Sequence, residues 1–577
     1  MPKRLAITVA GAVSLGSYEA GVLYEIVEAL RQHNEDPRTP PNERIEIDVL
    51  TGASAGGMTA TIAAQKLLFD APALRDPVKN SFRQPWVEDI DLMEMLKYDK
   101  DENEFASFFS SNLIRRIADK HLLARYEGTP PAPKPHPAAA KTIRLGLALS
   151  NMNGIDFKRD LDHYGSFTYS RFQDEQTVEL SDANDNRTSW EPLRTAALSC
   201  GAFPFAFRPV ELLRTNAQYS VYRYFVQFPA PGEIKHAFTD GGVFQNEPLG
   251  LAKRLVDATD KQKDEPNRFY LFIAPGAKTG TSVPPQPGEK AKKFFNAQAN
   301  LAQTAMQLIS AIFSQARFHD WIMAQDVNER VRLFNSRALQ LHRDMMLDPA
   351  DPSYIDWRSL RPAADALLPV LFGERQQQNA VVPSTRNRPA ETREAARTRL
   401  REQFSREYAE LTASFAEGAV GNEAANTWLD AIMAFEKAAE LHGKDEMHIY
   451  GITATDDELS GELLSAFGGF FDHRYREHDY LVGRKKAQEF LAKLNGPGAL
   501  ATTDGLGPIR FTPGSIPPIS AQPVRMKDLD KERRKQFVER ILSRASRGLE
   551  EAGLPSVIVA PLRIFFLRPK LNKLLEL

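Results

Sequence analysis

The stretch IDVLTGASAGGMTATIAAQKLL, residues 47–68, decides how the N-terminal part of this chain is expected to fold. Its first residues are apolar and typical of a buried strand, and the small and apolar residues from 57 to 69 predict a helix. Gly52-Ala53-Ser54-Ala55-Gly56 lies between them and fits G-x-S-x-G, a sharp strand-to-helix turn that exposes the serine hydroxyl. The pattern alone leaves Ser54 open to two interpretations, a nucleophile or a packing residue in a tight turn.

Other apolar segments extend the same architecture. Residues 5–10 (LAITVA) predict a first strand, followed by a glycine-containing turn and a helix. Residues 143–150 (IRLGLALS) and 268–274 (RFYLFIA) are near-continuous apolar runs, as in strands that are buried on both faces. Repeated strand-turn-helix units predict an α/β fold with a mostly parallel, helix-covered sheet.

Changes in composition divide the chain into four expected parts. The first part of a catalytic domain covers residues 1–275, and a long, charged, helical segment covers 290–445. Strand character returns at residues 447–453 (MHIYGIT), so residues 446–495 are expected to resume the catalytic domain. The helical segment is then an insertion, with a separate helical domain as the rival interpretation. Residues 525–577 form a basic, amphipathic C-terminal segment.

The composition of the chain argues against several classes of protein. The 577 residues include 73 basic and 75 acidic side chains, so the overall charge gives no reason to expect a nucleic acid as a partner. The single cysteine, Cys200, excludes an internal disulfide framework and a cysteine-rich metal site, which suits a reducing compartment. A cleaved secretory signal and a membrane-spanning stretch are not evident, and the cytoplasm is the expected location.

Two further motifs could complete a serine site. Gly11-Ala12-Val13-Ser14-Leu15-Gly16 follows the first strand, and its N–H groups could stabilise an oxyanion; a plain strand-to-helix turn is the alternative. Asp240 is followed by Gly241 and Gly242, so its carboxylate could lie in a loop close to another segment and act as a base. Alone, an Asp-Gly-Gly sequence is most often a turn.

Together the three motifs, in this order, resemble the patatin-like phospholipases. Three more segments match that family: Ala20-Gly21-Val22-Leu23, the ALSCGAFP sequence at residues 197–204, and Asn246-Glu247-Pro248. The resemblance covers residues 5 to about 274 and implies a three-layer α/β fold. It assigns Ser54 as nucleophile and Asp240 as proton acceptor, without a metal or cofactor. The further motif positions that it implies are Gly11, Ala12 and Val13 for the oxyanion hole, with Gly16, Gly52, Gly56, Gly241 and Gly242.

The activity that the resemblance implies is hydrolysis of a lipid or phospholipid ester. Such a serine lipid acyl hydrolase, of the phospholipase A or lysophospholipase type, would work through an acyl-enzyme on Ser54. An acyltransferase on the same scaffold and a catalytically weakened lipid-binding or membrane-recruited protein are alternatives. A further alternative is an α/β-hydrolase triad that uses one of the late histidines, His442, His448, His473 or His478.

One departure from the family concerns the oxyanion turn. The family usually has three consecutive glycines and then a basic residue, G-G-G-x-R/K-G, whereas Ala12, Val13 and Leu15 stand here. Valine is a conformational outlier at positive φ. The sequence therefore predicts that the turn runs at negative φ around Val13, or that the hole is remodelled. Leu15 also removes a fixed positive charge.

Two segments outside the resemblance have functional interpretations. Residues 525–577 hold 13 basic and 7 acidic residues and could contact an anionic membrane surface, or simply pack as an amphipathic helix on the domain. Residues 471–480 (FDHRYREHDY) hold two histidines and three acidic residues, which could bind a metal or form an ion-paired cap.

Overall fold

The chain is described here from a computed structural model. It forms two compact units, the first made of Met1–Lys261, Glu265–Trp321 and His448–Leu577 and the second of Gln262–Asp264 and Ile322–Met447. The described residues are 2–98, 107–161, 165–222, 224–260, 267–276, 319–377, 408–417, 421–439, 446–455, 457–461, 468–496, 505–520 and 530–551, with isolated positions between these ranges.

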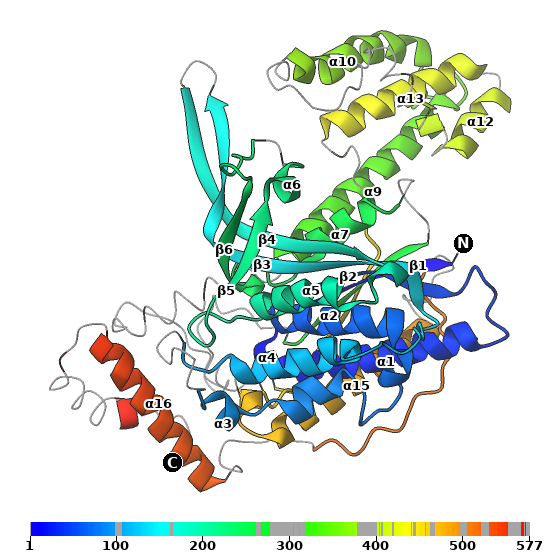
Figure 1. Cartoon of the computed structure of the whole chain (residues 1–577). Coiled ribbons are helices and arrows are strands. Elements are labelled where there is room, and N and C mark those ends of the chain that lie inside the picture. The colour runs from blue at the N-terminus through cyan, green and yellow to red at the C-terminus, as the bar shows by residue number, and fades with distance from the viewer. Residues whose placement is uncertain are drawn as a thin grey trace, which may run out of the picture. The chain divides into compact units, whose positions relative to one another are not determined.

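A central sheet organises the first unit (Figure 1). Its described strands follow the order β5-β6-β3-β2-β1-β7-β8, and β4 pairs with β3. The neighbours from β3 to β8 along this order run parallel, whereas β4, β5 and β6 join through antiparallel pairs. The expected mostly parallel sheet is therefore confirmed. The strands are β1 (Lys3–Val9), β2 (Ile45–Gly52), β3 (Ala139–Leu161), β4 (Gly165–Leu180), β5 (Val210–Thr215), β6 (Glu233–Asp240), β7 (Arg268–Ala274) and β8 (Ile449–Thr453).

Helices cover both faces of this sheet, which confirms the three-layer α/β fold. Strand β7 shows why: Phe269 and Leu271 join the main core on one face, whereas Phe272 and Ala274 pack with Leu249 on the other. Side chains alternate along a strand, so a continuously apolar strand needs cover on both sides. The main core takes in α1 (Gly16–Glu35), α2 (Ser54–Phe69), α5 (Arg187–Cys200) and α15 (His473–Asn495), and the opposite face has α7 (Leu249–Asp257).

The segment beyond residue 446 contributes a strand and a helix to the first unit. Strand β8 pairs in parallel with β7 at the edge of the sheet. Helix α15 crosses α1 closely at two glycines, because a Cβ at Gly21 would lie 2.1 Å from the carbonyl oxygen of Tyr480, and one at Gly483 would lie 2.1 Å from that of Tyr18. This close crossing places the first turns of α15 next to the start of α1.

The second unit is helical and has its own core. Trp428 is fully buried there, packs against Phe415, and donates a hydrogen bond from Nε1 to the carbonyl oxygen of Ala338 over 3.1 Å. Residues 277–303, which include the expected start of the insertion, lie outside the described residues. The longer helices here are α9 (His319–Met345, which begins in the first unit), α10 (Trp357–Gln377), α12 (Ala409–Glu417) and α13 (Gly421–Ala438).

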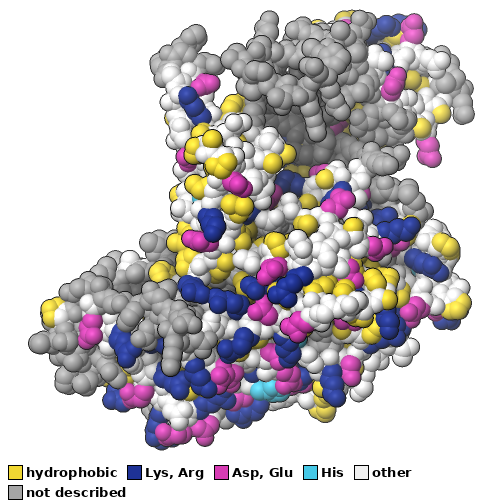
Figure 2. All heavy atoms as spheres, viewed as in Figure 1, with side chains coloured by type: hydrophobic (Ala, Val, Ile, Leu, Met, Phe, Trp, Pro, Cys, Tyr) yellow, Lys and Arg dark blue, Asp and Glu magenta, His cyan; other side chains and the backbone are white. Residues whose placement is uncertain are grey.

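The C-terminal helix α16 (Lys531–Glu551) packs an apolar face on the first unit. Val538 and Leu542 are buried, and the rings of Phe537 and Phe471 lie 4.4 Å apart. In the described part of the chain, no helix combines the length and the apolar character that crossing a bilayer requires. Basic and acidic side chains are interspersed over the face shown in Figure 2. The remaining short α-helices are α3 (Leu92–Met95), α4 (Asn112–Ala118) and α6 (Asn216–Tyr219).

Candidate active site

Ser54 lies at the turn from β2 to α2. Its backbone has φ +51°, a left-handed conformation that is uncommon for any residue but glycine and typical of a strained nucleophile elbow. The two motif glycines are needed for space. A Cβ at Gly52 would lie 2.5 Å from the backbone of Gly56, and a Cβ at Gly56 would lie 2.3 Å from the carbonyl oxygen of Ala10. The local sequence therefore forms the turn that the motif predicts.

Asp240 is the hydrogen-bond partner of this serine. Ser54 Oγ donates to Asp240 Oδ2 over 2.5 Å, and the N–H of Gly242 donates to Asp240 Oδ1 over 2.7 Å. The carboxyl group is buried at the end of β6. Burial raises the pKa of Asp240 from 3.8 to about 7, although the two hydrogen bonds act in the opposite direction. Near neutral pH the carboxylate is therefore poised to accept a proton.

The ALSCGAFP segment, residues 197–204, contacts the backbone next to both Ser54 and Asp240. The N–H of Asp240 donates to the carbonyl oxygen of Ala202 over 2.9 Å. The buried thiol of Cys200 donates to the carbonyl oxygen of Gly52 over 3.9 Å. Burial raises the pKa of Cys200 well above its ordinary value, although the backbone groups of Ser54 and Gly241 act in the opposite direction. A protonated, inert thiol thus connects the two motifs. This supporting role carries no recognisable sequence signal beyond the match to the family.

Asn246 clamps the start of the oxyanion turn. The N–H of Gly11 donates to the Asn246 carbonyl oxygen over 2.8 Å, and Asn246 Nδ2 donates back to the Gly11 carbonyl oxygen over 3.1 Å. A Cβ at Gly11 would lie 2.2 Å from Asn246 Oδ1, so a larger residue there would displace the Asn246 side chain. The N–H of Gly11 is thus already hydrogen-bonded within the protein. The N–H groups of Ala12 and Val13 lie ahead of the first helical hydrogen bond, which runs from Leu15 to Ala12.

The backbone at Val13 differs from one of the sequence expectations. Its φ is +53°, so the expectation of a negative φ at this residue is wrong. A β-branched residue in this region is strained, and such strain persists only where the surroundings hold it. Val13 packs against the main core and also lines the pocket beside Ser54. The turn therefore keeps a left-handed residue despite the loss of glycine.

Residues from the 446–495 segment hold this turn. The N–H of Gly469 donates to Ser14 Oγ over 3.0 Å. Leu15, which replaces the family's basic residue, is buried, and a Cβ at Gly461 would lie 2.9 Å from its Cδ2. Arg476 donates to the carbonyl oxygens of Gly469 and Val87, each over 3.0 Å. Sequence reasoning missed the contacts of Ser14 with Gly469 and of Leu15 with Gly461, because more than 440 residues separate the partners of each pair.

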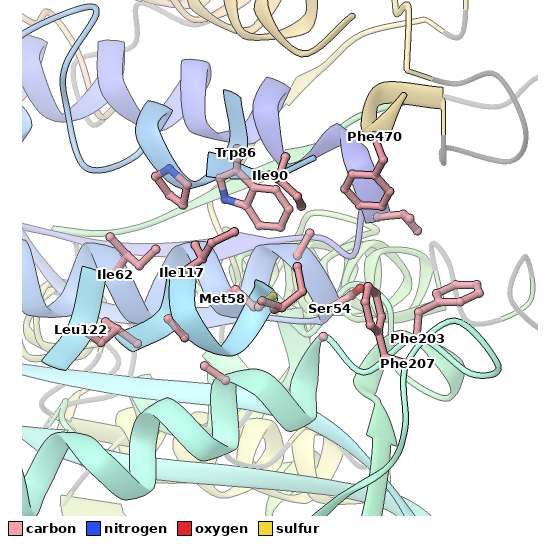
Figure 3. A pocket seen from close by; sticks show the side chains of 17 residues that line it. Ser54, Met58, Ile62, Trp86, Ile90, Ile117, Leu122, Phe203, Phe207 and Phe470 are labelled. Carbon is pink, nitrogen blue, oxygen red and sulfur yellow. The ribbon is translucent and has the colours of Figure 1, made fainter. Parts of the chain in front are cut away.

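An apolar pocket opens beside Ser54 (Figure 3). Its empty volume is about 750 Å³, including the space at its mouth. Among the described residues that line it, Ser54 supplies the only hydroxyl group, and Trp86 donates its Nε1–H to Thr59 Oγ1 over 2.9 Å. Such a lining suits a hydrocarbon chain. The other lining residues are Val13, Ala55, Met58, Ile62, Pro85, Ile90, Ile114, Ile117, Ala118, Leu122, Ala197, Gly201, Phe203, Phe207 and Phe470.

Two of the late histidines, His473 and His478, have polar partners away from Ser54, and the ring of His448 lies 6.1 Å from that of Phe269. His473 is half-exposed and lies 3.3 Å from Glu88, and His478 Nδ1 lies 3.1 Å from Asp479. His442 lies outside the described residues. Residues 471–480 form the N-cap and first turns of α15, and within the described part of the chain no three His, Cys, Asp or Glu side chains gather as metal ligands.

The fold and the site define a class of protein, an α/β protein in which a serine at a sharp elbow is hydrogen-bonded to a buried aspartate beside an apolar pocket. Residues 7–253 match the family described as patatin-like phospholipase, and this part of the chain is a patatin-like phospholipase domain. The description of that family names phospholipases, which are hydrolases of lipid esters.

Two curated relatives extend the comparison without adding an activity. The chain is 23% identical over 394 residues to the uncharacterized membrane protein Rv3479 of Mycobacterium tuberculosis, a match that covers 60% of this chain and 35% of that protein. It is 22% identical over 348 residues to the uncharacterized protein y4iI of Sinorhizobium fredii, covering 47% of this chain and 49% of that protein. The chain thus spans about half or less of the length of these relatives.

Proposed function

We propose that this chain is a serine lipid acyl hydrolase of the phospholipase A or lysophospholipase type, with Ser54 as nucleophile and Asp240 as base. The observation that carries the proposal is the 2.5 Å hydrogen bond from Ser54 Oγ to Asp240 Oδ2 beside an apolar pocket. A nucleophile, a buried base and an apolar acyl site are the parts that transfer of a lipid acyl group requires.

In the first step, Asp240 accepts the Ser54 proton while Oγ attacks the ester carbonyl carbon. The tetrahedral intermediate collapses by breaking the bond to the alcohol oxygen, which takes the proton from Asp240 and leaves as the head-group fragment. In the second step, a water molecule gives its proton to Asp240 and attacks the acyl-enzyme. The fatty acid leaves, and Ser54 recovers its proton.

The oxyanion donors in this proposal are the N–H groups of Ala12 and Val13 together with that of Ala55. Ala55 follows the nucleophile in the first turn of α2, where N–H groups have no partner within the helix. Because the N–H of Gly11 is already hydrogen-bonded to the Asn246 carbonyl oxygen, Gly11 has a structural role in this proposal. The left-handed Val13 supports an active site over the weakened, lipid-binding alternative, since the turn holds this strained residue instead of relaxing.

We also propose that residues 446–495 belong to the catalytic domain and that the helical segment is an insertion in it. The support is that β8 extends the sheet, that Phe470 lines the pocket, and that Gly469 hydrogen-bonds to Ser14 in the oxyanion turn. Truncation before residue 446 should therefore abolish ester hydrolysis. A truncated chain that folds and retains full activity would contradict this organisation.

Activity-based labelling tests the nucleophile. A fluorophosphonate probe should form an adduct with the wild-type protein at Ser54, identified by peptide mass spectrometry, and none with Ser54→Ala. Asp240→Asn should label at least a hundredfold more slowly, the usual scale of general-base loss. Ser546→Ala serves as the matched control, because Ser546 is also buried and its Oγ bonds only within α16. Equal labelling of wild type and Ser54→Ala would overturn the proposal.

Peripheral membrane contact through residues 525–577 is a further part of the proposed function. The apolar face of α16 is packed on the domain, so the contact would use the exposed Lys531 and Lys535 and their basic neighbours. The double charge reversal Lys531→Glu with Lys535→Glu should weaken co-sedimentation with anionic vesicles and leave stability unchanged. Unchanged co-sedimentation would remove this contact from the proposal.

A further inference from the structure

The pocket has a direction, which α2 sets. Ser54, Met58 and Ile62 recur every four residues and line the pocket from one face of this helix. Figure 3 shows Ser54 near Phe203 and Phe207, with Ile62 toward the opposite end. Phe203 and Phe207 are half-buried, whereas Ile62 is only 6% exposed. The mouth therefore lies beside the nucleophile, and the pocket runs inward along α2.

A second helical wall runs alongside α2. Ile114, Ala118 and Leu122 also recur every four residues, along α4 and the π-helix Asp119–Leu123 that continues it. Gln65 Nε2 of α2 donates to the carbonyl oxygen of Leu122 over 2.7 Å, and Leu122 is 2% exposed. This bond joins the two walls about one turn beyond Ile62, so the inner end of the pocket is closed by packed side chains.

The cover over this inner end is also anchored. Trp86 belongs to a second π-helix, Gln84–Asp89, and is fixed by its hydrogen bond to Thr59. The carboxylate of Asp89 in the same π-helix accepts hydrogen bonds from His121 Nε2 over 2.6 Å and Lys120 Nζ over 2.7 Å. These hydrogen bonds fix the π-helix Gln84–Asp89 to the π-helix Asp119–Leu123. An acyl chain longer than the pocket would therefore have to displace packed and hydrogen-bonded residues at the inner end.

The length of the pocket follows from helix geometry. Eight residues separate Ser54 from Ile62, which at 1.5 Å per residue gives about 12 Å. With carbon–carbon bonds of about 1.5 Å, an extended hydrocarbon chain advances roughly 1.3 Å per carbon, so about nine carbons fit between Ser54 and the closed end.

We propose that Ile62 and Leu122 set the acyl specificity of this site, so that it prefers esters of straight, medium-length acids of about nine carbons. This inference rests on the proposed function, because it takes Ser54 to be the acylated residue. The lining of the inner end has no charged side chain among the described residues, so the acyl chain rather than the head group enters it. The head group stays at the mouth, beside Phe203 and Phe207.

A chain-length series of p-nitrophenyl esters tests the proposal. With the wild-type protein, kcat/KM should rise from butyrate to octanoate or decanoate, by up to about fourfold per methylene, while carbons are being buried. It should then fall at dodecanoate and fall further at palmitate. Ile62→Ala should move the optimum to longer esters, and Ile62→Trp should move it to shorter ones, each changing the dodecanoate-to-hexanoate ratio by about tenfold in opposite directions.

Leu67→Ala is the matched control, because Leu67 is a fully buried residue of α2 that does not line the pocket. It should leave the ratio at the wild-type value. If Ile62→Trp does not fold, as judged by circular dichroism, Ala118→Leu narrows the same region from the other wall. A wild-type protein that hydrolyses palmitate as fast as decanoate, or Ile62 variants that keep the wild-type ratio, would overturn the inference.

The two proposals fail in different ways. Alkyl fluorophosphonates of increasing chain length separate them, since absence of a Ser54 adduct with every probe would refute the nucleophile itself. Labelling of Ser54 that does not depend on chain length would leave the nucleophile in place and refute only the role of Ile62 and Leu122.

Discussion

Two turns of the same kind meet at the candidate site, the elbow after β2 and the turn after β1. Each leads from a parallel strand into a helix, and each has one non-glycine residue in the left-handed region, Ser54 at φ +51° and Val13 at φ +53°. Such a residue costs about 1–3 kcal/mol. The elbow retains its family motif, whereas the turn has lost glycine from its middle positions.

The difference lies in what holds each backbone. At the elbow, glycine avoids a clash within the motif itself, since a Cβ at Gly52 would lie 2.5 Å from the backbone of Gly56, four residues along the chain. In the turn, Ser14 and Leu15 instead rest against Gly469 and Gly461 from the far end of the chain. The elbow is thus encoded locally, whereas the turn depends on a remote segment.

The same substitution should have opposite consequences in the two turns. Ser54→Gly relieves left-handed strain but removes the nucleophile, so ester hydrolysis should fall by roughly 10⁴-fold or more. Val13→Gly relieves similar strain and leaves the backbone N–H groups in place, so kcat/KM should stay within about threefold of wild type. Steady-state kinetics on p-nitrophenyl butyrate measure both effects.

Thermal unfolding provides the control for this pair. Both variants should unfold within a few degrees of the wild type, because relief of strain of about 1–2 kcal/mol offsets the side-chain contacts that are lost. If Val13→Gly lost as much activity as Ser54→Gly while remaining folded, the valine side chain itself would take part in the reaction, and the two turns would not differ as described.

The pH dependence of kcat/KM should be sensitive to Asp240, the partner of Ser54 at the elbow, and not to Val13 in the other turn. The pKa of Asp240 is raised to about 7, and only the ionised carboxylate can accept the Ser54 proton, so kcat/KM should rise with pH through about 7 and then level off. Val13→Gly should leave this limb unmoved. A profile that is flat from pH 5 to about 8 would contradict the role of Asp240 as base.

The same group links stability to pH. Because the folded-state pKa of Asp240 lies above the ordinary 3.8, its contribution to stability is fully present below pH 3.8 and is lost as the pH rises through about 7. Asp240→Asn removes this loss. Relative to wild type, its free energy of unfolding should therefore increase between pH 4 and about 8, by a few kcal/mol at most, in urea titrations at each pH.

The parts of the site that the sequence predicts are those with local causes. Residues 268–274 are apolar without interruption because β7 is covered on both faces, and Gly52 stands where a Cβ would clash with the backbone of Gly56. These constraints act within a few residues or within one strand. The parallel sheet, the elbow and the resemblance to the family could therefore be predicted from the sequence alone.

The parts that escaped prediction depend on distant partners. Pocket-lining residues such as Trp86 and Leu122 belong to no sequence motif, because any apolar residue of suitable size can fill such a position. The sign of φ at Val13 could not be predicted from the sequence, because Gly469, which holds the turn, lies more than 450 positions away. Such long-range support leaves no local pattern to recognise.

The remote tether itself should have the smallest effect. Ser14→Ala removes the acceptor of the Gly469 N–H, and a buried donor left unpaired costs about 1–3 kcal/mol. Unfolding should shift down by several degrees, and kcat/KM should fall by about threefold to tenfold as the oxyanion turn loosens. Ser17→Ala is the matched control, because Ser17 is equally buried but its Oγ bonds back to the Ser14 carbonyl oxygen, over 3.3 Å, within the same helix start. If the two alanine variants were equally active, the turn would hold its shape without its contact to Gly469, and both turns would count as locally encoded.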